Sequence, residues 1–418
     1  MSGGDVAGAA PGPWTIALAG AAALAVAMGI GRFAFTPLLP MMLADGVIDL
    51  HAASWLASAN YLGYLAGALL CTFGPAIRRW LPALPPLDSA RVVRGGLVAT
   101  ILLTLGMALP WPGSWPLLRF AAGVASAAVF VHSSGWCLVQ LARRNAPSIG
   151  GAMYTGPGAG IVVSGLFASA MVAWHWRAAS GWLIFGVLAL GLTAWIWRTF
   201  QSEPARPSAQ AQRPPADMPA GAEAMTMSTR HGSAEVACLA LAYGIAGFGY
   251  IITATFLPVI ARQALPQSPW LDFFWPLFGC GVVIGALVAT RLRIHGDLRL
   301  LLAGSYVLQA LAIGASLWSP TLAGFAFGSL LLGIPFTAIT FFAMQEVRRI
   351  RPASAASTIG LLTAIYGIGQ IVGPPLVALL LRRGGNPGAG FTLSLEIAAG
   401  ALVLGAMLFL GTSRVYPK

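Results

Sequence analysis

The sequence predicts an all-α polytopic membrane protein with 12 transmembrane helices, arranged as two pseudo-symmetric six-helix bundles. Its composition, the number of its apolar runs and an internal repeat predict this class. Of its 418 residues, 57% are hydrophobic and only 9% are charged, whereas a soluble domain carries about 25% charged residues. At about 20 apolar residues per span plus short loops, a chain of this length has room for about 12 spans.

The apolar runs give the expected spans in chain order. Each run is continuous rather than alternating, which excludes a β-barrel, and backbone in lipid must then satisfy its own hydrogen bonds as a helix. The runs cover residues 14–43, 53–75, 92–110, 114–141, 150–173, 178–197, 235–261, 271–291, 298–318, 320–346, 357–381 and 391–411.

One long polar segment, residues 198–234, interrupts this series after the sixth span. It is rich in Pro, Ala, Ser and Gln and cannot bury a core, so we expect a disordered linker on the cytoplasmic side. It separates an N-terminal six-helix bundle, residues 1–197, from a C-terminal six-helix bundle, residues 235–418.

The two halves also resemble each other in sequence. GIGRF at Gly29 is similar to GIAGF at Gly244, and GYLAGAL at Gly63 is similar to GVVIGAL at Gly281. Because these matches fall in corresponding helices and in register, they indicate a duplicated six-helix unit, which is a common construction of secondary transporters.

The positive charge reports topology rather than a nucleic-acid partner. The net charge is +12, but the basic residues are dispersed in pairs between apolar runs. With the N-terminus inside, 18 of them fall on the cytoplasmic side and 4 on the outer side. By the positive-inside rule, we expect both termini in the cytoplasm and the chain in the inner membrane of a bacterium.

The sequence predicts no metal, no cofactor and no enzymatic site. The four cysteines lie far apart inside apolar runs without metal-ligand spacing, and a Walker sequence for nucleotide binding is absent. We also find no metal cluster, paired acid and base or activated nucleophile. These cysteines are Cys71, Cys137, Cys238 and Cys280.

Glycines four residues apart recur in the second and fifth spans of each half. Such pairs allow two helix backbones to approach closely in lipid. They could serve static packing, or they could line a sliding contact between the halves formed by the second, fifth, eighth and eleventh spans. The pairs are Gly63 and Gly67, Gly156 and Gly160, Gly281 and Gly285, and Gly369 and Gly373, with Pro157 inside the second pair.

Taken together, this organisation resembles the major facilitator superfamily (MFS). LLRFAAGVASAA, with Arg119 and Gly123, is similar to the fourth-helix motif of the superfamily, and YTGPGAG is similar to its fifth-helix Gly-Pro motif. GIGRFAFTPLLPMM at residues 29–42, followed by ASANYLGYLAGAL, resembles the YbfB/YjiJ family of transporters. The resemblance implies the MFS fold and transport, and it gives Arg119 a gating or coupling role.

Polar residues inside the spans are the candidate site, because burying them in a membrane is costly. Arg32 lies about 18 residues into the first span, either as a structural arginine or as a contact for substrate or gate. His132 is either a hydrogen-bonded structural histidine or a carrier of protons or substrate. The remaining candidates are expected to donate and accept hydrogen bonds in a central cavity: Asn60, Tyr154, Gln309 and Gln370.

These observations predict a monomeric secondary transporter that moves a small organic solute by alternating access. Since no carboxylate falls at the predicted midplane near Arg32, an anionic or carbonyl-rich substrate is favoured, and protons are a candidate coupling ion. Two alternatives stay open: an exporter of drug-like or neutral compounds, and a receptor or scaffold that uses a transporter fold without transporting.

Overall fold

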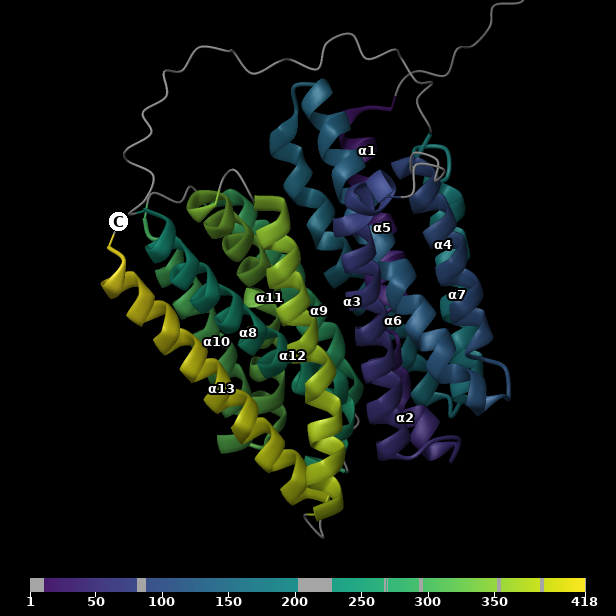
Figure 1. The fold of residues 1–418 in the computed structure, drawn as a ribbon. Helices are drawn as coiled ribbons and strands as arrows, with labels where there is room; N and C mark the ends of the chain where they lie inside the picture. Colours follow the sequence, from purple (N-terminus) through teal and green to yellow (C-terminus); the bar gives the residue numbers. More distant parts are fainter. Residues whose placement is uncertain are drawn as a thin grey trace, which may run out of the picture.

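The computed structural model describes residues 11–80, 88–201, 228–266, 268, 270–292, 296–351, 355–383 and 387–417, and their regular structure is helical (Figure 1). Twelve helical segments are long and apolar enough to cross a membrane. The first half contains α1 (Pro13–Leu24), η1 (Ala25–Ile30), α2 (Phe35–Ala44), α3 (Leu50–Trp80), α4 (Ser89–Gly106), η2 (Pro112–Ser114), α5 (Trp115–Arg143), η3 (Pro147–Thr155), α6 (Gly156–Ala173) and α7 (Ala178–Ile196).

The second half contains α8 (Ser228–Ala264), η4 (Leu271–Phe273), α9 (Phe274–Arg291), α10 (Leu298–Trp318), α11 (Leu322–Ile350), α12 (Ala355–Arg383) and α13 (Pro387–Val415). The prediction of 12 spans is confirmed. The start of α8 is a correction, because seven residues predicted as linker, 228–234, belong to this helix. Residues 202–227 lie outside the described part, so the disorder of the linker stays a prediction.

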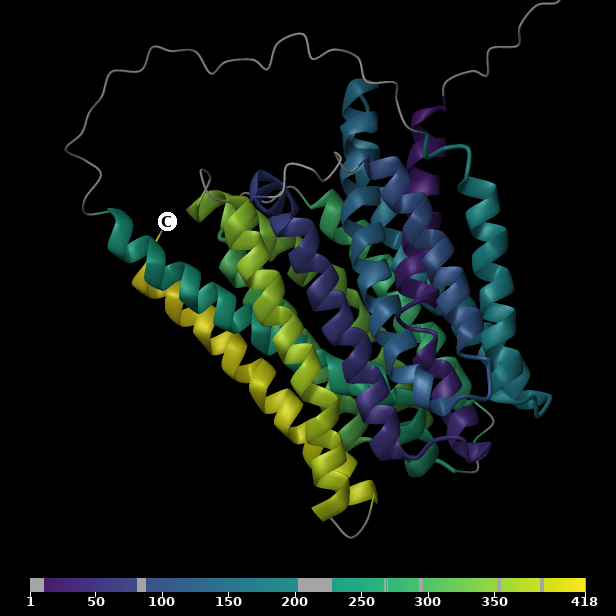
Figure 2. The same cartoon turned by 45° about the vertical axis from the view of Figure 1, so that its right-hand side comes forward.

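The two halves lie side by side, and both ends of the described chain lie at the same end of the molecule (Figures 1 and 2). We call this the termini end and the opposite one the distal end. Since each span crosses once, the starts of α1 and α8 and the last turns of α5 and α11 lie toward the termini end. In both views the helices of the two halves lean apart in that direction.

The first span, predicted as one run over 14–43, is a broken helix. After α1 the chain winds as a π-helix, passes through a turn at residues 31–34 and starts again as α2. Pro37 lies in the first turn of α2, where its missing N–H is not needed. π-helical turns inside membrane helices often accompany functional sites, and this one places Arg32 in the turn.

Two helix pairs join the halves along most of their length. α3 packs on α12, where the Ser58 hydroxyl donates to the Ile371 carbonyl at 3.0 Å. α6 packs on α9, and the Ser169 hydroxyl donates to the Asp272 carbonyl of η4 at 3.1 Å. These are the second, eleventh, fifth and eighth spans, so the helices expected between the halves are the ones found there.

A third contact between the halves is confined to the distal side of Arg32. Here α2 packs on α8, and the Thr36 hydroxyl donates to the Ala254 carbonyl at 2.9 Å. The hydroxyls of Tyr61 and Thr255 share a hydrogen bond of 2.8 Å. Toward the termini end, η3 packs on the last turn of α9, where a Cβ on Gly151 would lie 2.7 Å from the Thr290 side chain. No comparable packing in the described residues joins α1 or α5 to α8 or α11.

Candidate functional site

A buried arginine lies where the halves meet. Arg32, only 3% exposed, donates a hydrogen bond of 2.7 Å from Nη2 to the side-chain oxygen of Gln370 on α12. The Gln370 amide nitrogen in turn donates to the hydroxyl of Tyr250 on α8. One hydrogen-bonded chain therefore runs from the broken first span of one half to two helices of the other.

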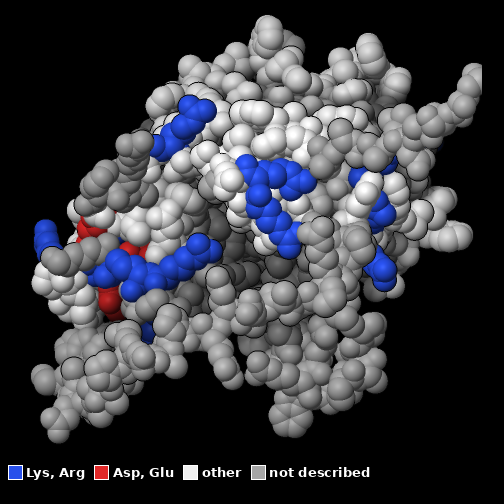
Figure 3. Space-filling view, turned by 90° about the horizontal axis from the view of Figure 1, so that it is seen from above, with Lys and Arg blue, Asp and Glu red and all other residues white. Residues whose placement is uncertain are grey.

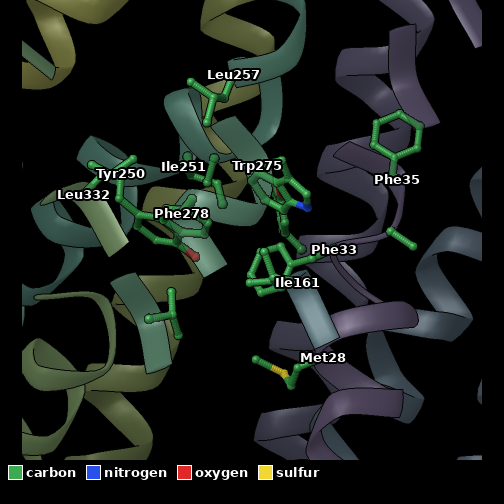
Figure 4. Close-up of a cluster of buried hydrophobic side chains, with 14 of the residues drawn as sticks. Met28, Phe33, Phe35, Ile161, Tyr250, Ile251, Leu257, Trp275, Phe278 and Leu332 are labelled. Carbon is green, nitrogen blue, oxygen red and sulfur yellow. The ribbon is translucent and has the colours of Figure 1, made fainter. Parts of the chain in front are cut away.

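Aromatic rings surround this guanidinium. Its central carbon lies 4.1 Å from the ring centroid of Tyr64, 5.2 Å from that of Tyr61 and 5.3 Å from that of Phe33. Phe33 lies 6.2 Å from Trp275 and 6.1 Å from Phe336, again measured between ring centroids. Figure 4 shows Phe33 reaching from the first span toward Trp275, with Tyr250 and Phe278 on the facing side.

We call this set the aromatic cluster, and both halves contribute to it. Its members are Phe33, Tyr61, Tyr64, Tyr243, Tyr250, Trp275, Phe278, Phe336 and Tyr366.

The charge of Arg32 has no counter-charge in the described part of the chain, where no ion pair includes it. Asp272 is paired with Arg262, and Glu396 is exposed on the outside of α13. Two buried donors of the site, Arg32 Nε and Trp275 Nε1, also lack acceptors among the described residues. The site therefore supplies a cation and hydrogen-bond donors, and what it lacks is an acceptor.

Arg119 and Asn60 lie beside Arg32 but serve the backbone. Arg119 on α5 donates to the carbonyls of Gly31 at 3.1 Å and Arg32 at 3.0 Å, which are two carbonyls of the turn that breaks the first span. The amide of Asn60 on α3 donates to the Arg119 carbonyl at 2.8 Å. Arg119 thus holds the turn that carries Arg32, and the gating role expected for it stays a prediction.

Three other candidates are placed elsewhere. The His132 ring shares a hydrogen bond of 3.1 Å with Ser89 at the start of α4. Tyr154 on η3 lies 6.3 Å from the Phe130 ring, within the same half. Gln309 on α10 is buried, and its side-chain oxygen has no partner among the described residues. The described contacts bring Arg32 and Gln370 together and do not include these three residues.

The paired glycines pack inside the halves, which agrees with the static-packing alternative and not with the alternative that they line a sliding contact between the halves. A Cβ on Gly63 or Gly67 would meet the backbone of α5, and one on Gly156 or Gly160 would meet α1 or η1. In the second half, Gly281 and Gly285 lie against α11, and Gly369 and Gly373 against α8. Pro157 is buried in the first turn of α6.

The helix pairs that approach most closely lie within each bundle. Only glycine leaves room for two helix backbones at such short distances, so the paired glycines are found inside the bundles. Contacts between the halves use other glycines: a Cβ on Gly158 would lie 2.8 Å from the Gly279 carbonyl oxygen, and one on Gly367 would lie 3.2 Å from the Leu65 side chain.

Sequence reasoning missed a buried ion-pair network at the termini end of the second half. Arg299, 2% exposed, contacts Glu235 at 3.0 Å and Asp297 at 2.8 Å. Arg349 contacts Glu346, which is 0% exposed, at 2.6 Å. In Figure 3, which views this end, the acidic side chains gather on the same side as the second half. The network joins α8, α10 and α11. Its signal in the sequence was the pair Glu346 and Arg349, which are three residues apart and so lie on one face of a helix.

The sequence analysis also missed the tyrosines of the aromatic cluster. The chain has 8 tyrosines, and Tyr61, Tyr64, Tyr243, Tyr250 and Tyr366 gather around Arg32 and Gln370. Their signal was their position in the middle of apolar runs, away from the membrane interfaces where tyrosine is usually enriched.

Two six-span halves around a polar residue on a broken helix define a multi-pass membrane transporter of the major facilitator superfamily. The family model described as "Uncharacterised MFS-type transporter YbfB" matches residues 24–410. The chain belongs to this family. A search of curated proteins finds no significant match.

Solved structures show the same fold. The nucleoside transporter NupG, in a mutant form, superposes with a TM-score of 0.71 at 15% identity, covering 95% of this chain and 99% of that one. A bacterial homolog of the human lysosomal transporter Spinster, in an inward-facing and unoccupied conformation, superposes with a TM-score of 0.67 at 15% identity, covering 98% of each chain. At this identity the likeness concerns the fold.

Proposed function

We propose that the protein is a secondary transporter that binds a small organic anion at Arg32 and carries it across the bacterial inner membrane by alternating access. The observation that supports this most is that the Arg32 guanidinium has fewer hydrogen-bond acceptors than donors around it. Of its adjacent Nε and Nη2 donors, one has a neutral acceptor in Gln370 and the other has none in the described chain. A carboxylate presents two acceptor oxygens at the spacing of such a pair.

Magnitudes favour a bound anion over a purely structural arginine. Burying an unpaired ion costs several kcal/mol even after relaxation of the surroundings. Stacking on Tyr64 returns about 2 kcal/mol, and a hydrogen bond from a charged donor about 1.5–3 kcal/mol. Neither contact supplies the missing opposite charge, which an anionic substrate brings with it.

The opening direction follows from the contacts between the halves. Packing of α2 on α8 closes the distal side of Arg32. Toward the termini end, the described contacts between the halves are those of η3 with α9 and of α3 with α12, and no comparable packing joins α1 or α5 to α8 or α11. The excess of basic residues in the loops at the termini end supports a cytoplasmic location for that end. We therefore assign this conformation as facing the cytoplasm, with Arg32 reached from that side.

Arg32→Met and Arg32→Lys test the anion site. We expect Arg32→Met to lower proteoliposome uptake of carboxylate substrates by about 100-fold, because truncating one partner of a buried charge pair costs 2–5 kcal/mol. Arg32→Lys should lower this uptake by about 10-fold, since lysine keeps the positive charge but lacks the two parallel N–H donors of the guanidinium. The substrate used is found first by screening carboxylates and quaternary ammonium ions for thermal stabilisation of the purified protein. Unchanged uptake by Arg32→Met, or stabilisation by the cations alone, would contradict the proposal.

Coupling to protons is tested separately with His132→Gln. Because His132 bonds to Ser89 and has no described contact with Arg32, we expect this variant to retain uptake and its response to an imposed pH gradient. The measurement is initial uptake with the vesicle interior at equal or higher pH. Loss of the pH-gradient response with retained counterflow would instead identify His132 as the proton carrier.

A further inference from the structure

We propose that the anion bound at Arg32 is an aromatic carboxylate, with its carboxylate on the guanidinium and its ring against Tyr64. This inference rests on the proposed function and adds the body of the substrate to its charge. The observation behind it is that the tyrosines on one side of Arg32 are buried, whereas those on the other side are half-buried.

The buried members of the aromatic cluster form the closed side of the site. Tyr61, Phe33, Tyr250 and Trp275 are each at most 4% exposed, and Tyr61 is also bonded to Thr255 across the halves. These rings are occupied by contacts with one another and with the distal packing of α2 on α8. They leave no free face for a ligand in this conformation.

The half-buried members, Tyr64, Phe336 and Tyr366, form the accessible side. Tyr64 precedes Leu65 and Tyr366 precedes Gly367, and Leu65 and Gly367 face each other across α3 and α12. The two tyrosines therefore lie at the same level on opposite halves. The described residues show no ring contact between them, and the proposed ring of the ligand lies between the two.

The two tyrosines present different parts of their rings. One face of Tyr64 carries the Arg32 guanidinium at 4.1 Å, and no ring contact is described for its second face, where the proposed ligand binds. Tyr366 is stacked between Tyr243 at 4.6 Å and Tyr250 at 6.0 Å, so both of its faces are occupied and its edge remains. A planar ring bound here has a face on one side and an edge on the other, and aromatic pairs prefer such offset-stacked and edge-to-face arrangements.

The carboxylate completes the donors that the chain leaves open. One oxygen accepts from Arg32 Nε, and the other accepts from Nη2 in place of Gln370 Oε1. Gln370 is bonded to Tyr250 through its amide nitrogen and can turn while that bond is kept. Because Gln370 belongs to the second half and Arg32 to the first, binding exchanges a contact between the halves for a contact with the substrate.

Benzoate and cyclohexanecarboxylate test this inference, because they share charge and carbon number and differ in the π-system. We expect benzoate to bind purified wild-type protein about tenfold more tightly by calorimetry, from one or two aromatic contacts. Equal affinities would overturn the aromatic inference and leave the anion site standing. Absence of binding by both acids at 10 mM would overturn both proposals, as would tighter binding of the neutral benzamide.

Variants of Tyr64 assign the effect to this ring. Tyr64→Leu should reduce the preference for benzoate to about twofold, whereas Tyr64→Phe should keep it. Tyr154→Leu is the matched control, because Tyr154 is also half-buried inside a span and lies outside the aromatic cluster. An unchanged preference in Tyr64→Leu, with the variant folded as judged by its melting temperature, would overturn the assignment.

Discussion

Two arginines lie next to each other at the centre of this protein and have different tasks. Arg32 is bonded to one side-chain acceptor and stacked on rings, whereas Arg119 is bonded to the carbonyls of Gly31 and Arg32. A buried guanidinium that satisfies backbone carbonyls stabilises the fold. Both guanidinium groups have an Nε without a partner among the described residues. Arg32 differs in that its hydrogen bond goes to a side chain of the other half, which the proposed ligand would replace.

Methionine substitutions separate these tasks, because methionine keeps most of the side-chain volume and removes the charge. We expect Arg119→Met to lower the melting temperature in detergent by about 5 °C or more, since two hydrogen bonds from a charged donor, each about 1.5–3 kcal/mol, are lost. Arg32→Met should leave the melting temperature unchanged or raise it. The opposite ranking in a fluorescence-monitored thermal scan would show that Arg32 is the structural residue.

At the scale of single residues, the sequence located part of the site. Arg32 could be found because a charge deep in an apolar run is rare, and Gln370 because an amide there needs a partner. The mid-span position of the tyrosines was a signal that the sequence offered, but it did not show that their rings gather into one cluster. Its assembly depends on how α3, α8 and α12 are rotated about their axes, which a single sequence does not specify.

At the scale of helices, the number and order of the spans could be predicted because a long apolar run has one stable structure in lipid. The helices against which the paired glycines pack could not be predicted. Gly63 and Gly67 fit a contact with any helix that approaches closely, and the structure gives them α5 of the same half. The break in the first span was also missed, although Arg32 within residues 31–34 and Pro37 and Pro40 just after them interrupt an otherwise apolar run.

Two glycines on α12 distinguish packing within a half from packing between halves. A Cβ on Gly369 would lie 2.2 Å from the Gly244 carbonyl oxygen on α8, whereas one on Gly367 would lie 3.2 Å from the Leu65 side chain across the halves. We expect Gly369→Ala to reduce the yield and melting temperature of the protein, because backbone must move. Gly367→Ala should fold normally and slow uptake several-fold per folded molecule.

The measurements for this pair are monodisperse yield, melting temperature and initial uptake. Since the two residues lie two positions apart on one helix, effects of helix propensity are matched. Normal stability of Gly369→Ala would show that α8 and α12 have room to separate. Full uptake by Gly367→Ala would show that the contact of α3 with α12 does not change during transport.

At the scale of the whole molecule, the halves are joined unevenly. The α3–α12 and α6–α9 pairs run along most of the bundle, so neither pair alone decides which end is open. The α2–α8 contact lies only on the distal side of Arg32. In the proposed alternating access, the closed end has to open while the other end closes, so α2 and α8 are the elements that we expect to separate.

Cross-linking at this contact tests that requirement. Thr36 and Ala254 are joined by a hydrogen bond of 2.9 Å from the hydroxyl to the carbonyl oxygen, so cysteines at these positions lie close together when the distal end is closed. In a background with the four native cysteines replaced by alanine or serine, we expect oxidised T36C/A254C to lose uptake. Reduction should restore it, and each single cysteine variant should be insensitive to oxidant. Ligand should still bind to the oxidised protein from the termini side, since Arg32 is reached from there in this conformation. Full uptake by a quantitatively cross-linked protein would mean that the distal contact stays closed throughout transport, and the moving parts would then have to be sought within one half.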